Sequence, residues 1–130
     1  MKESNLRFSN PIIKKLDYKV NANNKQEDKY SISNSFSINV NKNSKQNEAF
    51  VELNICIGDE SKLEPFTITM SILAKFVWDD VYDEKTVNDL LTINAPSLLL
   101  GYARPIIATI TNMSPYPTYN IPFYNFMENP

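Results

Sequence analysis

The stretch from Phe66 to Trp78 alternates between strongly apolar positions and smaller or more polar ones along its whole length. Alternation with a period of two places every second side chain on the same face of a β-strand. The apolar set comprises Phe66, Ile68, Met70, Ile72, Ala74, Phe76 and Trp78. Burial of each large member is worth about 1.5–3 kcal/mol, which is too much to leave in water. The chain must therefore build a sheet whose apolar face is covered.

Three earlier stretches show the same period and predict three further strands. In the first of them Leu16, Tyr18 and Val20 alternate with charged residues. The segments between the strands are rich in Asn, Ser, Gly and charged residues, as turns and loops are. The predicted strands lie within residues 11–20, 35–40 and 51–57, and the predicted loop and turns are residues 21–29, 41–47 and 58–61.

Two helices are predicted after the strands. A short one begins at Thr86 and ends at Asn94, and a longer one covers residues 96–113, because proline is favoured in the first turn of a helix and Pro96 stands there. The apolar residues of the longer helix recur at helical spacing and predict that one face of this helix is buried. That face comprises Leu99, Tyr102, Ala103, Ile106, Ile110 and Met113.

Short-looped strands followed by helices indicate an α+β fold class: a four-stranded antiparallel meander sheet with a kinked long helix packed on one face. The length of 130 residues predicts a single domain, residues 1–130. The helix over residues 96–113 is too short to cover the whole apolar face. We therefore expect a partner subunit to supply the rest of the core.

The composition removes several classes of function. The net charge of −2 gives no electrostatic reason to expect nucleic acid or an anionic membrane as the main partner. The N-terminus leads into no signal-peptide core, and no window approaches the ~18 apolar residues of a membrane span, so we expect a cytoplasmic protein without membrane insertion.

Histidine is absent and Cys56 is the single cysteine, which excludes Ser-His and Cys-His nucleophiles and an intrachain disulfide. We expect no enzyme, no metal, no cofactor and an unreactive thiol at Cys56.

The region 96–126 resembles the SecB family of protein-export chaperones. That family carries a pattern of Pro, then Tyr-Ala-Arg, then Ile, followed by a Pro- and aromatic-rich segment ending in Asn-Phe. The matching residues here are Pro96, Leu98, Leu99, Tyr102, Ala103, Arg104 and Ile107, then the run from Tyr116 to Ile121, and Asn125 with Phe126.

The resemblance implies a homotetramer, a dimer of dimers, that acts as a holdase without ATPase activity. Such a chaperone binds unfolded preproteins along apolar grooves and delivers them to the SecA motor, so SecA is a candidate partner. Gly101 stands where the family has proline, and Pro105 where it has a polar residue, so we expect a displaced helix kink. The sequence ends at Pro130, where the family continues into a second helix, so we expect that helix to be lacking.

We predict a client-binding set and an oligomer interface. The client-binding set is Tyr30, Ile32, Trp78, Tyr116, Tyr119, Ile121, Phe123 and Phe126, and the alternative for these residues is packing on their own sheet or on a neighbouring subunit. The interface set is Tyr102, Arg104, Ile106 and Ile110; Arg104 would pair with a carboxylate across the interface or in a local salt bridge. The acidic run of Asp79, Asp80, Asp83 and Glu84 would be a docking patch or a solvated linker.

Two functions remain open at this point. One is an ATP-independent holdase for non-native polypeptides in protein export. The other is an oligomeric SecB-fold protein that recognises one specific protein partner, for example of the antitoxin type.

Overall fold

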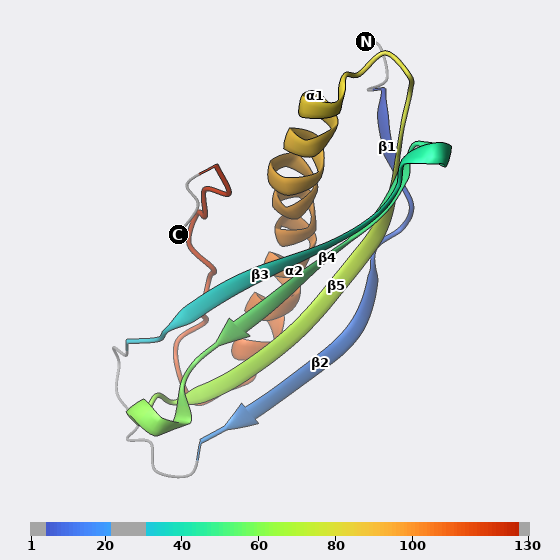
Figure 1. The fold of residues 1–130 in the computed structure, drawn as a ribbon. Helices are drawn as coiled ribbons and strands as arrows, with labels where there is room; N and C mark the ends of the chain where they lie inside the picture. The colour runs from blue at the N-terminus through green and yellow to red at the C-terminus, as the bar shows by residue number, and fades with distance from the viewer. Residues whose placement is uncertain (1–4, 22–30, 128–130) are drawn as a thin grey trace.

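The computed structural model describes residues 5–21 and 31–127. Its centre is an antiparallel sheet, with a helix and the C-terminal segment on one face (Figure 1). The strand order is β1 then β5, β4 and β3, and β2 also pairs with β5, following β1 along the same edge. The strands are β1 (Leu6–Phe8), β2 (Ile12–Val20), β3 (Asn34–Asn43), β4 (Glu48–Ile57) and β5 (Phe66–Trp78).

The α+β prediction is confirmed, but the predicted meander holds only for β3, β4 and β5. Strand β2 pairs with β5 rather than with β3, so that Leu16 lies opposite Met70 and Tyr18 opposite Ile68. The short strand β1, which precedes the first predicted strand, extends the same edge. Strand β5 is therefore a central strand, paired with β1 and β2 on one side and with β4 on the other. Its apolar side chains alternate over its full length because it has strands on both sides.

The predicted helices are one continuous helix. It begins with α1 (Glu84–Asp89), passes through the π-helical segment η3 (Leu90–Asn94) and continues as α2 (Ala95–Thr111). The predicted start at Thr86 is wrong, because the carboxylate of Asp83 caps the helix by accepting from the Thr86 backbone N–H at 2.7 Å. The predicted break near Pro96 is also wrong, since a π-helical turn precedes it and the chain stays helical. Pro105 lies inside α2.

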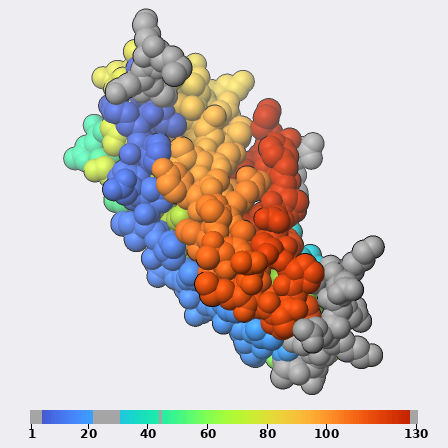
Figure 2. Space-filling view, turned by 180° about the vertical axis from the view of Figure 1, so that it is seen from behind, coloured from blue at the N-terminus to red at the C-terminus, as the bar shows by residue number. Residues whose placement is uncertain are grey.

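The core lies between this helix and the sheet. The buried face of α2 includes Leu99, Ala103 and Ile107, whereas Tyr102 is 45% exposed. The predicted helix face is therefore correct at Leu99 and Ala103 but rotated away from Tyr102, and Met113 is exposed. Seen from the helix side, α2 lies between the N-terminal strands and the C-terminal segment (Figure 2).

The continuous helix from Glu84 to Thr111 is long and apolar enough to cross a membrane by length and composition alone, with a mean hydropathy of 1.2 in its most apolar window. The expectation that no such window exists is therefore wrong. A helix that packs on a sheet within a core passes the same test, and 39% of this window is buried inside the fold. The hydropathy is accounted for by the packing on β4 and β5.

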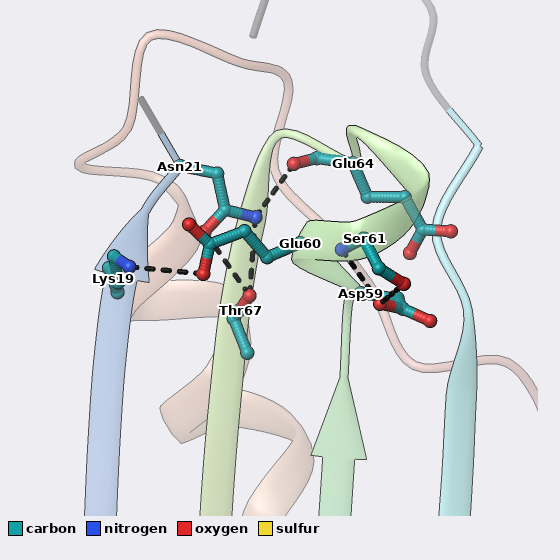
Figure 3. Close-up of polar contacts among 7 residues, drawn as sticks. All are labelled: Lys19, Asn21, Asp59, Glu60, Ser61, Glu64 and Thr67. Carbon is teal, nitrogen blue, oxygen red and sulfur yellow. Dashed lines mark hydrogen bonds and ion pairs between the residues drawn. The ribbon is translucent and has the colours of Figure 1, made fainter. Parts of the chain in front are cut away.

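The connection between β4 and β5 is a compact polar turn (Figure 3). Gly58 has a positive φ of 85°, and the 3-10 helix η2 (Glu60–Lys62) follows, capped by the Asp59 carboxylate. The buried Glu64 then ties this turn to its neighbours. Its carboxylate accepts from the backbone N–H and the hydroxyl of Ser33 at 2.8 and 2.7 Å, and its carbonyl accepts from Asn21 Nδ2 at 2.7 Å.

The connection between β3 and β4 is also short. It contains the 3-10 helix η1 (Ser44–Gln46) and then Asn47, whose φ is 49°. Both connections overlap the predicted turns, but β3 continues to Asn43 and so takes up the first three residues of the turn predicted over 41–47.

Candidate functional site

The C-terminal segment, residues 112–127, has no helix or strand beyond the end of α2 but is held in place by hydrogen bonds. Arg104 donates from Nε to the carbonyl of Ile121 at 3.2 Å and from Nη2 to the carbonyl of Pro122 at 3.1 Å. The backbone N–H of Tyr119 donates to the hydroxyl of Thr111 at 2.9 Å. The segment is thereby fixed beside α2, as Figure 2 shows for the red part of the chain.

An aromatic cluster, defined as Phe36, Tyr124 and Phe126, joins the C-terminal segment to β3. The ring centroids of Phe36 and Tyr124 are 4.5 Å apart, and those of Tyr124 and Phe126 are 4.7 Å apart. All three residues are partly buried. They therefore form a half-open apolar surface at the edge of the core.

The predicted client-binding residues separate into three groups. Trp78, Tyr116 and Ile121 are buried in the core, which is the packing alternative that the sequence left open. Ile32, Tyr119 and Phe126 are partly buried, and Phe123 is 86% exposed. Tyr30 lies outside the described residues. Among the described members, Phe123 is thus the one that is mostly exposed, and Phe126 is the one that belongs to the half-open aromatic cluster.

Strand β3 contributes residues that sequence reasoning did not assign to the site. Phe36 belongs to the aromatic cluster, and Val40 is exposed on the same face of the strand. The available signal was that β3 alternates apolar residues with Ser and Asn and has no charged residue before Lys42. Alternation alone does not say which strand stands at an edge.

A second apolar surface lies at the opposite edge of the sheet. This apolar strip is defined as Phe8, Ile13, Leu16, Val20 and Tyr102, all of them exposed. The rings of Phe8 and Tyr102 meet at a centroid distance of 6.2 Å, which joins β1 to α2. The sheet partners of Phe8 and Leu16 are core residues, so the strip lies on the core side of the sheet.

The predicted interface residues are only partly brought together. Tyr102 belongs to the apolar strip, and Ile106 and Ile110 are partly buried on α2. Arg104 instead contacts the C-terminal segment, where it donates to backbone carbonyls. The local salt bridge predicted for Arg104 does not occur among the described residues, and its pairing with a carboxylate across a subunit interface stays a prediction.

No family model and no curated protein sequence matches this chain. The chain is similar in structure to a SecB-like chaperone of Mycobacterium tuberculosis in complex with a ChAD peptide from the HigA1 antitoxin. The TM-score is 0.75, and the match covers 92% of this chain and 90% of that chain at 12% identity. The protein has the SecB-like fold. A protein of unknown function from Streptococcus agalactiae has a TM-score of 0.53 at 12% identity, over 91% of this chain and 97% of that one.

The outer face of the SecB-like sheet is mostly polar, although Phe50 and Ile12 are exposed on it, and its carboxylates Glu48 and Glu52 are paired. Lys14 donates to Glu52 at 3.1 Å, and Lys75 lies 3.5 Å from Glu48. The Lys14 hydrogen bond holds the pKa of Glu52 below its ordinary value, with Asn39 adding a weaker contribution. This face is therefore closer to neutral than its carboxylates alone would make it.

The acidic run before the helix serves the fold. Asp79 pairs with Arg7 at 3.1 Å, and Asp80 accepts a hydrogen bond from Asn47. Asp83 caps the helix, and hydrogen bonds from Thr86 hold its pKa below its ordinary value. These contacts give the run structural partners, and its role as a docking patch stays a prediction.

An open pocket of about 330 Å³ lies beside the start of the helix. The buried Trp78 lines it together with Tyr82, while Lys42 and Glu84 bring opposite charges to it. Over the described residues, no three His, Cys, Asp or Glu side chains are grouped so as to hold a metal ion.

Proposed function

We propose that the protein is an ATP-independent holdase chaperone of the SecB-like type, which binds non-native polypeptides rather than catalysing a reaction. The observation that carries this proposal is the half-open apolar surface made by the aromatic cluster, together with the 86% exposed Phe123, which precedes Tyr124 in the chain. Flat aromatic side chains bind varied apolar segments at a low cost in conformational entropy. A fixed backbone beneath them, held by Arg104, lowers the ordering cost further.

The SecB-like fold supports the proposal, because the similar chaperone of Mycobacterium tuberculosis was solved with a bound peptide. We further propose that the protein is a cytoplasmic homotetramer. The apolar strip supports self-association, since exposed apolar residues such as Leu16 and Tyr102 are those that a neighbouring subunit would cover.

Delivery of preproteins for export, with SecA as a partner, belongs to the same proposal through the resemblance of residues 96–126 to the SecB family. The outer face of the sheet lends this part less support. Its carboxylates Glu48 and Glu52 are each paired with a lysine, whereas docking to SecA in that family relies on an acidic sheet surface.

A second function is recognition of one specific protein partner, of the antitoxin type. It is favoured by the fact that the peptide bound to the similar Mycobacterium tuberculosis chaperone comes from an antitoxin. On this proposal the same apolar surface would bind one sequence tightly rather than many sequences weakly.

The test is suppression of aggregation. The purified protein is added to several unrelated proteins that are unfolding by heat or by dilution from denaturant, and light scattering is followed. A holdase suppresses scattering for most clients at near-stoichiometric oligomer, without nucleotide. Failure with every client would overturn the holdase proposal, and a pull-down that recovers one dominant partner would then support the second function.

A further inference from the structure

Strand β3 is an edge of the sheet whose outward backbone groups can be assigned residue by residue. Ser33 stands opposite Gly58, one step beyond the pair Asn34 and Ile57, and its carbonyl accepts from the Gly58 N–H at 2.7 Å. Bonded and non-bonded pairs alternate along an antiparallel ladder. The odd-numbered residues of β3 therefore bond to β4, and Phe36, Ile38 and Val40 direct their N–H and C=O groups away from the sheet.

The same three residues carry their side chains on the core face. Phe36 lies opposite Ile55, Ile38 opposite Leu53 and Val40 opposite Val51, and these partners in β4 are buried. Between Asn34 and Lys42, each outward backbone group of this edge thus belongs to a residue with an apolar side chain.

The C-terminal segment does not occupy this edge. It contacts β3 through rings, and Asn34 Nδ2 donates to the Tyr119 hydroxyl at 2.7 Å. Within residues 5–21 and 31–127, no backbone hydrogen bond joins that segment to β3. The segment therefore adds an apolar wall beside the edge and leaves the backbone groups of the strand available.

The two edges of the sheet differ in charge. Strand β2 carries Lys14, Lys15, Asp17 and Lys19, and charged residues, lysine above all, are the usual protection against a further strand. Strand β3 has no charged residue between positions 34 and 41. Of the two edges, β3 is the one suited to accept a strand.

We propose that the edge of β3 binds an extended polypeptide segment as an additional antiparallel strand, with the apolar side chains of the segment beside Phe36, Ile38 and Val40. This inference rests on the proposed function and specifies how the non-native chain is held. Main-chain hydrogen bonds supply affinity that does not depend on sequence, and alternating apolar residues supply the selection. Such a site suits clients of different sequence.

The test uses a fluorescein-labelled peptide of about nine residues, with Val, Phe and Tyr alternating with Thr, Ser and Asn. Two variants carry N-methyl groups, one on the amides of the apolar residues and the other on those of the polar residues. In antiparallel addition, residues directly opposite share a face, so the apolar residues of the peptide donate to β3. Methylating them should weaken binding at least about tenfold by fluorescence anisotropy, and methylating the polar set should change it less than about threefold.

A protein variant tests the same contact from the other side. Val40→Pro removes one outward N–H without removing a donor to β4, a position at which an edge strand tolerates proline. Val40→Thr keeps the shape and the N–H and is the matched control. Val40→Pro should weaken binding of the unmodified peptide several-fold and Val40→Thr should not, with folding of both checked by circular dichroism.

The outcomes separate this inference from the proposed function. If the unmodified peptide fails to bind and no client is protected from aggregation, both the strand-addition inference and the holdase proposal are overturned. If clients are protected but the two methylated peptides bind equally well, strand addition alone is overturned. A loss of oligomer mass in Val40→Pro would assign the edge to a second copy of the chain, and weaker binding of the polar-set peptide alone would make the added strand parallel; both results overturn the proposal.

Discussion

The guanidinium Nε of Arg104 lies 3.2 Å from the backbone carbonyl oxygen of Ile121, to which it donates a hydrogen bond. One side chain of the helix thus fixes the position of the C-terminal segment. Ile121 is buried, so the contact places its side chain in the core and leaves the neighbouring Phe123 in solvent. The orientation of the candidate binding surface depends on this pair.

Arg104→Gln should lower the free energy of unfolding by about 1–2 kcal/mol, because two hydrogen bonds from a charged, partly buried donor are lost. Urea unfolding measures this change, and limited proteolysis should show faster cleavage within residues 112–127. Arg7→Gln is the control, since Arg7 forms an exposed pair with Asp79, and such pairs contribute about 0–1 kcal/mol. Equal effects of the two substitutions would contradict the role assigned to Arg104.

Gly58→Ala should destabilise the fold by about 2–4 kcal/mol. Gly58 has a φ of 85°, and a Cβ there would lie 1.8 Å from the carbonyl oxygen of Phe66. The matched variant is Gly101→Ala on α2, where a Cβ would meet nothing within 4 Å. Because alanine favours the helix, that variant should gain about 0.5–1 kcal/mol. Thermal unfolding of both variants measures the contrast.

The sequence predicted the strands well because alternation is a local property. The buried face of β5, from Phe66 to Trp78, was correct at every position. The partner of β2 was not predictable in the same way, because Leu16, Tyr18 and Val20 would alternate identically beside β3 or beside β5. Strand order depends on contacts between distant residues, which periodicity does not report.

The same limit applies to the helix and to the site. Asn94 and Pro96 indicated a helix boundary locally, yet a π-helical turn carries the chain through it. Tyr116 and Phe123 have similar aromatic character in a segment without period, and one is buried while the other is exposed. Hydrogen bonds from Arg104 and to Thr111 fix this segment and so decide which of its side chains are buried. The residue spacing in the sequence does not predict these hydrogen bonds.

Acidification should weaken the fold through carboxylates whose pKa is lowered in the folded state. The pKa of Glu52 lies below its ordinary value of 4.5, chiefly because Lys14 donates a hydrogen bond to it. A lowered folded pKa gives stability that is present above the unfolded pKa and lost as the pH falls through the folded pKa. Glu52→Gln should therefore flatten the loss of stability below about pH 4.5, by less than about 1 kcal/mol because Lys14 is exposed.

Chemical unfolding at a series of pH values tests that expectation, with Lys14→Met as the companion variant. Both variants should flatten the profile, Lys14→Met the less of the two, because Asn39 still donates a hydrogen bond to Glu52 in that variant. A profile for Glu52→Gln that follows the unmodified protein down to about pH 3 would show that Glu52 contributes nothing to the acid sensitivity.

Leu16→Glu should lower the oligomer mass, because it places a charge in the apolar strip that we propose to lie between subunits. Sedimentation velocity should then report a species lighter than the unmodified oligomer, down to the single-chain mass of 14.9 kDa if the strip is needed for every subunit contact. Asp17→Asn, on the other face of β2, is the control and should leave the mass unchanged. An unmodified protein that sediments as a stable monomer would remove the basis for this interface.

Phe123→Ser should weaken protection against aggregation several-fold while leaving the free energy of unfolding within about 0.5 kcal/mol, because the side chain is exposed and supports little of the core. Tyr116→Ala provides the contrast. Its side chain is buried against Phe66, so that variant should lose about 3–5 kcal/mol of stability. Light scattering with two unrelated clients, paired with urea unfolding, measures both effects. Unchanged protection by Phe123→Ser would place client binding elsewhere on the molecule, since no other predicted client residue in the described chain is as exposed.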